Sequence, residues 1–304
     1  MELRHLRYFI VLAEELNFTR AAERLHIEQS PLSRVIKDLE EELGTPLFHR
    51  GRRGSRLTTA GDVLLTDARQ VLAMMEQMRK NVRAIASGYR GVIRIAISDG
   101  AVEPRLSGLL ARLRADEPEL EVRMSDVPLS SQLRGLRDGH FDVGLALSND
   151  VGKGIVAEAI WVDPLLAVVP LSHPLLAFPR VPLHELVRHP LVLCDPAVRE
   201  GCSQQITRFL RAEGGEPIIA EYAGSIDMML IFVAAGYGVG FVTDAQMEIC
   251  RHPEVAMRPV DAKEAMMTTY LLQPASGRSE LAERFVVRLH RHALQQSRDH
   301  DISP

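Results

Sequence analysis

The sequence is poor in cysteine and aromatic residues, and it has no long hydrophobic run. Three cysteines stand in 304 residues, so we expect a reducing compartment, the cytoplasm, and no structural disulfide. No apolar stretch approaches the roughly 20 residues that are needed to cross a bilayer. The first ten residues, MELRHLRYFI, carry charges within their apolar part and therefore predict no secretory signal.

What the sequence does contain is the balance of an ordinary globular protein. Hydrophobic residues make up 46% and charged residues 25%, and the length suggests about two domains. The formal net charge is −4, but the first 90 residues are slightly basic while the remainder is acidic. This asymmetry is a weak indication that the N-terminal part has a polyanion as its partner.

The first 57 residues predict three short helices and a hairpin. Apolar residues from Leu6 to Ala13 follow helical spacing, Asn17 or Thr19 can cap a second helix, and a third runs from about Gln29 to Leu43. The break of three residues before the third helix makes the last two helices a helix-turn-helix. Such a motif can place its second helix in the major groove of DNA.

The third helix has one apolar and one polar face. Gln29, Ser33, Arg34 and Lys37 lie on the polar face. Gln and Arg side chains can pair with base edges, whereas Ser and Lys can reach phosphates. Taken alone, such a face is more often an ordinary solvated surface, so the interpretation depends on the segments that follow.

Two following segments support a DNA-binding interpretation. The predicted hairpin at 47–57 carries Arg50, Arg52, Arg53 and Arg56 around two glycines, which suits a minor groove or its phosphates. A helix from about 59 to 87 follows and would be about 43 Å long. Its apolar positions alternate in spacing as in a coiled-coil seam, which favours a dimer. These positions are Leu64, Ala68, Val71, Met75, Met78, Val82 and Ile85.

From residue 92 onward, predicted strands alternate with predicted helices. The first strands are expected at 92–97, 120–125 and 142–147, with helices at 104–115 and 131–138. This order predicts a parallel sheet covered on both faces. A second such set is expected to have strands at 165–170, 190–193, 217–222 and 238–243 and helices near 203–213 and 225–235. A strand at 268–274 and a helix at 279–296 complete the chain.

The segment from 18 to 61, FTRAAERLHIEQSPLSRVIKDLEEELGTPLFHRGRRGSRLTTAG, resembles the winged helix-turn-helix of the LysR-type transcriptional regulators. The matching residues include Ala21-Ala22, Gln29, Ser33 and Leu43-Gly44. HPLL at 173–176 and VAAGYGVGFV at 233–242 extend the resemblance more weakly over nearly the whole chain. The resemblance implies a transcriptional regulator without a cofactor. It would bind promoter or operator DNA in the cytoplasm as a homodimer or homotetramer.

The resemblance also implies the fold class, an α/β protein with an N-terminal all-α winged helix-turn-helix. Residues 1–57 would form the DNA-binding domain, and 58–90 would form the linker, dimerisation helix and hinge. Residues 91–304 would form a two-lobed effector domain similar to periplasmic binding proteins. Lobe I would comprise about 91–161 and 267–300, and lobe II would comprise about 162–266.

The polar face, the hairpin and the resemblance together give the expected DNA contacts. Ser30 and Pro31 lie at the entry of the third helix, and many relatives have a second proline where Ser30 offers a hydroxyl. The full set is Gln29, Ser30, Pro31, Ser33, Arg34, Lys37, Arg50, Arg52 and Arg53.

The effector is expected at the carboxyl ends of the strands, because open α/β sheets bind ligands there. Several of these loops precede helices, whose N-terminal amides favour an anion. Asp99 would repel an anion unless its carboxylate were turned away or paired, and it would otherwise suit a cationic or hydroxylated ligand. The expected residues are Ser98, Asp99, Gly100, Leu129, Ser130, Ser131, Cys202, Ser203, Ser225 and Thr243.

Other functions are weighed against this one. Cys202 resembles the reactive cysteine of peroxide-sensing family members, although their resolving cysteine is missing; a redox-responsive regulator is therefore one alternative. A ligand-insensitive architectural DNA-binding protein is another, and a solute-binding module or α/β enzyme with a degenerate N-terminus is a third. We expect no enzyme and no metal site. The glycine run at 236–240 lies between a helix and a strand, where a dinucleotide fingerprint cannot lie, and the histidines and cysteines show no zinc spacing.

Overall fold

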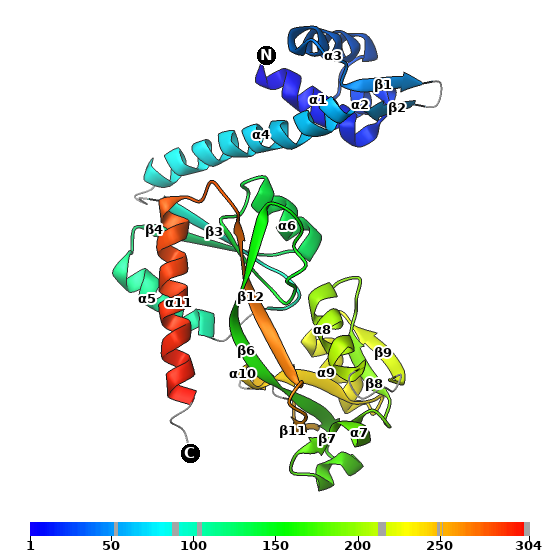
Figure 1. Ribbon diagram of the computed structural model, residues 1–304, viewed down its shortest axis with the longest axis vertical. Coiled ribbons are helices and arrows are strands. Elements are labelled where there is room, and N and C mark those ends of the chain that lie inside the picture. The colour runs from blue at the N-terminus through cyan, green and yellow to red at the C-terminus, as the bar shows by residue number, and fades with distance from the viewer. Residues whose placement is uncertain are drawn as a thin grey trace. The chain divides into compact units, whose positions relative to one another are not determined.

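The computed structural model describes residues 1–51, 54–86, 91–101, 105–211, 217–247, 250 and 252–300. The chain divides into an N-terminal unit, residues 1–83 with 138–140, and a C-terminal unit, residues 84–137 and 141–304. Figure 1 traces the elements of both. The helices predicted for the first part and the mixture of strands and helices predicted for the second are present.

Three helices and a hairpin make up most of the N-terminal unit. They are α1 (Leu3–Glu15), α2 (Phe18–Arg24), α3 (Gln29–Leu43), β1 (Phe48–Gly51) and β2 (Gly54–Leu57). The helices enclose an apolar core that includes Phe9, Leu32, Ile36 and Leu39. The apolar stripe of α3 therefore faces the core, and its polar face is left to solvent.

Local side-chain bonds fix the ends of these elements. Asn17, one of the two expected caps, begins α2, because its side chain accepts hydrogen bonds from two N–H groups of the first turn. Gly44 ends α3 in the left-handed region, at φ 69°, as predicted. The Glu40 carboxylate accepts hydrogen bonds from the N–H groups of Leu47 and Phe48, and this ties the hairpin to α3.

The long helix α4 (Thr59–Ala86) begins at Thr58, whose Oγ1 accepts a hydrogen bond from the N–H of Gly61 at 3.0 Å. The predicted seam on α4 is largely open to solvent on the single chain. Val71, Met78 and Val82 are 42%, 60% and 67% exposed. Leu64 and Met75 are half-buried, Ala68 is buried, and the side chain of Ile85 lies outside the described part.

A mixed sheet of eight strands runs through the C-terminal unit, in the order β4-β3-β5-β12-β6-β11-β7 with β10 paired to β6. The first strand, β3 (Gly91–Ile97), pairs in parallel with β4 (Leu120–Asp126) and β5 (Val143–Ala146), as predicted. The long strand β6 (Ile155–Pro170) runs antiparallel to β12 (Met266–Pro274), β10 (Gly240–Thr243) and β11 (Val255–Asp261). The short β7 (Val181–Pro182) pairs in parallel with β11.

Two of these strands differ from the sequence prediction. The strand expected at 165–170 is only the second part of β6, which starts at Ile155 and has 16 residues. Its first part alternates between buried and exposed side chains and includes Glu158 and Asp163, so it lacks an apolar run. The strand β11 is missing from the prediction because its side chains are mostly half-buried. The second set of strands is therefore not a parallel repeat of the first.

The C-terminal unit has two lobes, and β6 and β12 run from one to the other (Figure 1). The first lobe contains β3, β4 and β5 with α5 (Arg105–Asp116), α6 (Leu129–Arg137) and α11 (Glu280–His300). The second lobe contains the parallel pair β8 (Leu191–Cys194) and β9 (Ile219–Ala223). Its helices are η1 (Pro174–Ala177), α7 (Leu183–Leu186), α8 (Glu200–Arg211), α9 (Ile226–Ala234) and α10 (Asp244–Met247).

One buried apolar cluster extends through both lobes and includes Ile95 and Leu145 of the first and Ile206 and Phe209 of the second. The shared core holds the lobe faces together along β6 and β12. Among the described helices, none has the length and apolar character that spanning a membrane requires.

Candidate DNA-binding surface and effector pocket

The polar face of α3 is an open surface. Gln29, Ser30, Pro31, Arg34 and Lys37 are exposed, and Ser33 is half-buried. Arg34 makes no ion pair or hydrogen bond with any residue that the structure describes. The ammonium group of Lys37 lies 3.2 Å from the Glu41 carboxylate, with both side chains exposed, and such a surface pair is easily exchanged for a phosphate. Helix α3 therefore presents donors that can reach bases and backbone.

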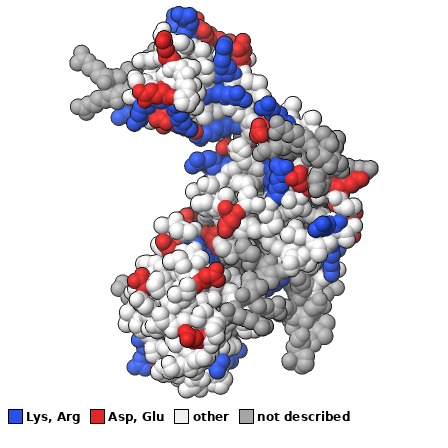
Figure 2. Space-filling model, turned by 180° about the vertical axis from the view of Figure 1, so that it is seen from behind, with Lys and Arg blue, Asp and Glu red and all other residues white. Residues whose placement is uncertain are grey.

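Other cations of the N-terminal unit are held by carboxylates. Arg24 lies 2.9 Å from Glu14 and 3.1 Å from Glu15, and Arg69 lies 3.0 Å from Glu14. Figure 2 shows Lys and Arg gathered on this unit with Asp and Glu among them. The guanidinium of Arg34 differs from those of Arg24 and Arg69 because no carboxylate of the described residues neutralises it.

The hairpin is described only in part. Its two strands pair from Phe48↔Leu57 to Gly51↔Gly54, which confirms the predicted hairpin. Arg52 and Arg53 lie outside the described residues, and so does the side chain of Arg50. Arg56 is exposed on β2.

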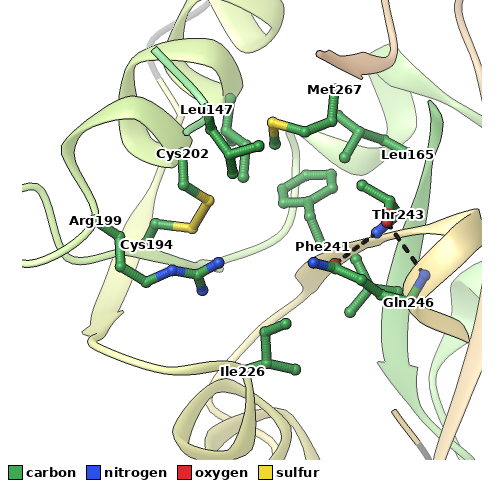
Figure 3. A pocket seen from close by; sticks show the side chains of 12 residues that line it. Leu147, Leu165, Cys194, Arg199, Cys202, Ile226, Phe241, Thr243, Gln246 and Met267 are labelled. Atoms are coloured by element: carbon green, nitrogen blue, oxygen red, sulfur yellow. Dashed lines mark hydrogen bonds between the residues drawn. A yellow bond between two sulfur atoms is a disulfide. The ribbon is translucent and has the colours of Figure 1, made fainter. Parts of the chain in front are cut away.

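A small pocket lies in the C-terminal unit where α8, α9 and α10 approach β6 and β10 (Figure 3). The cavity has a volume of about 20 Å³, which is room for about one water molecule. Its lining is mostly apolar. The residues are Leu147, Leu165, Cys194, Arg199, Cys202, Ile206, Ile226, Phe241, Val242, Thr243, Gln246 and Met267.

Arg199 is the charged member of this lining. Its side chain is buried, with 7% of the residue exposed, and its Nε–H donates a hydrogen bond to the main-chain oxygen of Asp99 at 3.0 Å. Burial lowers the pKa of Arg199, and the charges of Asp99 and Asp126 oppose that change. In Figure 3 the guanidinium points into the pocket, toward the side on which Gln246 lies.

Thr243 and Gln246 form the opposite polar wall. The Thr243 N–H donates to the Gln246 side-chain oxygen at 3.1 Å, and the Gln246 N–H donates to Thr243 Oγ1 at 3.2 Å. Both residues are buried. These reciprocal bonds fix the end of β10 to the start of α10.

Asp99 is not among the residues that line the pocket, and its carboxylate is hydrogen-bonded within the protein. Oδ1 accepts a hydrogen bond from the N–H of Gly201 at 3.0 Å, in the first turn of α8, and Oδ2 lies 3.3 Å from Ser98 Oγ. Burial raises the pKa of Asp99, and these hydrogen bonds and the charge of Arg199 act in the opposite direction. The backbone of Asp99 is left-handed, at φ 58°, which aspartate tolerates better than most residues.

The expectation of no structural disulfide is wrong. Cys194, the last residue of β8, and Cys202, in the first turn of α8, form a disulfide with their Cα atoms 6.2 Å apart. The chain reverses direction in the loop between β8 and α8. Two cysteines that are eight residues apart in the sequence therefore come close enough to form the bond. Cys250 is a buried free thiol, and burial raises its pKa.

The structure places the predicted effector residues in several environments. Cys202 and Thr243 line the pocket, and Gly100 lies against the Arg199 guanidinium. Ser98 is buried and donates to the Gln132 side chain at 2.8 Å. The others do not line this pocket: Leu129 lies in a buried apolar cluster, Ser130 and Ser131 are exposed, Ser203 is half-buried, and Ser225 caps α9.

Sequence reasoning missed Arg199, Gln246 and the apolar walls. Arg199 belongs to a loop with ordinary charged residues around it, and Gln246 stands outside any motif. A usable signal for the second was the short spacing from Thr243 to Gln246 at the end of a predicted strand, which is a side-chain capping pattern.

Comparison with known proteins assigns both parts of the chain. Residues 3–62 match the family model for bacterial regulatory helix-turn-helix proteins of the lysR family, and residues 86–294 match the LysR substrate binding domain. The transcriptional regulator YnfL of Escherichia coli (strain K12) is 34% identical to it, over 90% of this chain and 92% of YnfL. The regulator CatR of Pseudomonas putida is 36% identical, over 80% of this chain and 82% of CatR.

A solved structure agrees with this assignment. This chain is similar to the crystal structure of full-length CbnR complexed with its target DNA. The match covers 96% of this chain and 100% of the CbnR chain, with a TM-score of 0.67 and 26% identity. The chain belongs to the LysR family of transcriptional regulators.

Proposed function

We propose that this regulator reads operator DNA with α3 and responds to a small molecule that enters the pocket between Arg199 and Gln246. The proposal is carried by two observations in one chain. Arg34, on the second helix of the helix-turn-helix, has no ion-pair or hydrogen-bond partner among the described residues, and a pocket in the C-terminal unit is lined by the buried guanidinium of Arg199. Residues 1–57 serve as the DNA-binding domain, 58–90 as linker and dimerisation helix, and 91–304 as the effector domain.

The contacts to DNA come from α3 and the hairpin. Gln29 and Arg34 read base edges, and Ser33 and Lys37 hold phosphates. The hairpin arginines Arg50, Arg52 and Arg53 reach the adjacent minor groove. Two chains joined along the apolar seam of α4 present two copies of α3 to a partly palindromic site.

The effector acts by shifting the populations of two arrangements of the effector domain. The pocket has room for about one water molecule in the arrangement described here, so a larger ligand binds an opened arrangement more tightly. Only such a difference in affinity between the two arrangements lets the ligand change the spacing of the contacts on the DNA or the bend of the DNA. The polar groups of the pocket suit this role, because an arginine, a threonine and an amide bind a ligand without supplying a general base. We infer a regulator and not an enzyme, working in the cytoplasm.

The test is a footprint on the DNA just upstream of the gene's own start, with and without a mixed metabolite pool. Protection whose length or hypersensitive bands change with the pool supports the proposal. Protection that never changes contradicts control by a small molecule. The same footprint with the Arg34→Ala variant provides the control for sequence reading.

The disulfide favours a second candidate function, a regulator that responds to hydroperoxides. In the reduced protein the Cys202 thiolate, stabilised by the start of α8, would attack a peroxide oxygen and release water, leaving a sulfenic acid. The Cys194 thiolate would then attack that sulfur and release a second water. Two thiols are thereby oxidised to the disulfide, and one hydrogen peroxide is reduced to two waters.

This candidate is tested by footprinting after treatment with hydrogen peroxide or dithiothreitol. A footprint that differs between the two in the wild type and in Cys250→Ser, but not in Cys202→Ser, supports it. Identical footprints in the wild type, with thiol counting that shows the disulfide opened and closed, contradict it.

A further inference from the structure

The end of helix α1 has two features that are unfavourable for a helix on its own. Glu14 and Glu15 are its last two residues, and no basic residue lies in its last turn. The negative end of the helix dipole repels carboxylates at this position. The C-cap, Leu16, is left-handed at φ 50°, a conformation that leucine rarely adopts. Contacts from outside α1 therefore have to compensate for both features.

Arginines from two other helices supply the opposite charge. Glu14 Oε1 accepts a hydrogen bond from Arg69 Nη2, on α4, at 3.0 Å, and Glu14 Oε2 lies 2.9 Å from Arg24 Nη2, on α2. Glu15 Oε1 accepts a hydrogen bond from Arg24 Nη1 at 3.1 Å, and the main-chain oxygen of Glu15 accepts one from Arg20 Nη2 at 2.6 Å. Each oxygen of the Glu14 carboxylate thus contacts a different helix, so this one side chain joins α2 to α4.

The backbone at the same corner joins the hairpin. The main-chain oxygen of Leu16 accepts a hydrogen bond from the N–H of Ser55, a buried residue of β2, at 2.9 Å. Residues 14–16, which we call the α1 junction, therefore contact α2, β2 and α4. These elements are the first helix of the helix-turn-helix, the hairpin and the helix that carries the apolar seam.

Apolar packing alone fixes the direction of α4 only weakly. In the core of the N-terminal unit α4 buries Ala68, whose side chain is small, and packs the half-buried Leu64 and Leu65 against it. Burial of apolar surface is not directional, whereas a charged hydrogen bond is. Arg69 makes such a bond, and it lies between Ala68 and the seam residue Val71 in the sequence. The contact between Glu14 and Arg69 therefore orients the seam relative to the helix-turn-helix.

We propose that Glu14 is a positioning residue: it fixes the direction of α4 relative to α3 and so sets the distance between the two DNA half-sites that a dimer binds. The proposal rests on the proposed function, because the direction of α4 determines this distance only when two copies are joined along α4. In such dimers the half-site spacing follows from the geometry of the protein. A two-fold axis repeats any rotation at the α1 junction in both copies, so both α3 helices move.

The test is selection by the full-length protein from a pool of random double-stranded DNA, followed by sequencing. We expect the wild type to select two half-sites at one predominant spacing. Glu14→Ala and Arg69→Gln should select the same half-site sequence, because α3 is unchanged. The share of sites whose spacing differs by one base pair should rise about threefold or more, because the orientation of α4 is less restricted.

Folding is measured separately by urea unfolding. The side chains of Glu14, Arg24 and Arg69 are 33%, 50% and 29% exposed, and ion pairs that are open to solvent contribute little to stability. We therefore expect both variants to fold. If Glu14→Ala does not, Arg69→Gln still gives the answer, because it removes the contact to α4 and keeps the contact between Glu14 and Arg24. A loss of stability alone lowers the amount of DNA recovered and leaves the distribution of spacings unchanged.

Glu23→Gln is the control for charge. Glu23 is exposed on α2, and its side chain makes no ion pair or hydrogen bond with any residue that the structure describes. The substitution removes one negative charge from the same unit without changing the α1 junction. It should therefore keep the spacing that the wild type selects.

Three results overturn the proposal, and they differ from one another. If the spacing is unchanged in folded Glu14→Ala and Arg69→Gln, the α1 junction does not set it. If the spacing is unchanged but binding to all DNA becomes more dependent on salt, the carboxylates only neutralise arginines that would otherwise hold phosphates. If the wild type selects no sequence at all, the proposed function fails, and the role of Glu14 fails with it.

Discussion

The Nε–H of Arg199 donates a hydrogen bond to the main-chain oxygen of Asp99 at 3.0 Å, although 100 residues separate the two in the chain. Asp99 belongs to the loop after β3 in the first lobe, and Arg199 precedes α8 in the second. In the same loop, the Asp99 carboxylate accepts a hydrogen bond from the N–H of Gly201. The residues that orient the guanidinium therefore also fasten the two lobes to each other.

The close approach at this junction requires a glycine at position 201. A Cβ added there would lie 2.6 Å from Asp99 Oδ2 and 2.7 Å from the main-chain carbon of Leu147. We predict that Gly201→Ala destabilises the protein by about 1–3 kcal/mol, because backbone must move to admit the methyl group. Urea unfolding measures the change.

Gly224→Ala is the matched control for this substitution. A Cβ at Gly224 meets no atom within 4 Å, so its effect on the unfolding free energy should stay within about 0.5 kcal/mol. Equal unfolding free energies for the two variants would contradict the prediction and show that the contact between α8 and the first lobe can widen at little cost.

The raised pKa of Asp99 predicts a pH dependence of stability. Between the ordinary pKa of an aspartate and the raised pKa in the fold, the native state binds more protons than the unfolded state. The contribution of Asp99 to stability therefore increases as the pH falls through its folded pKa and is smallest at neutral pH. Urea unfolding of the wild type and Asp99→Asn from pH 7 downward should show the wild type gaining relative to the variant. A difference that does not change with pH contradicts a shifted Asp99.

Local signals made the N-terminal elements predictable. The apolar stripe of α3, the cap at Asn17 and the left-handed Gly44 all act within a few residues of one another. The spacing on α4 and the alternation of elements after residue 91 are equally local. Such patterns indicate which face of a helix is buried and which is exposed before any tertiary contact is known.

The pocket could not be predicted in the same way, because its geometry depends on contacts between distant segments. Arg199 is directed by an oxygen 100 residues away, and Gln246 is oriented by a backbone N–H at a strand end. The disulfide between Cys194 and Cys202 depends on how the loop between β8 and α8 turns, which the spacing of eight does not reveal. The predictions for Cys202 and Thr243 are confirmed as pocket-lining positions because Cys202 lies at the start of a helix and Thr243 at the end of a strand.

Two residues on one face of α3 should fail in different ways when they are removed. Arg34→Ala should cost about 1–3 kcal/mol on the operator and relax discrimination at one base position, because a base contact is lost. Lys37→Ala should weaken binding to all sequences about equally and reduce the salt dependence, because a phosphate contact is lost. Competition binding with operator and unrelated DNA at several salt concentrations separates the two. If operator preference survives in Arg34→Ala and Gln29→Ala, α3 does not read the sequence.

The seam on α4 leads to a prediction about assembly. Val82 is 67% exposed on the single chain, at a position where a heptad would place it against a second helix. A glutamate there would bury two like charges in the dimer, so Val82→Glu should shift sedimentation from dimer or tetramer toward monomer and reduce operator affinity. Val63 is 60% exposed on the same helix but outside the heptad positions, so Val63→Glu changes charge equally without touching the seam. Dissociation in Val63→Glu with an intact assembly in Val82→Glu would move the interface to another face of α4.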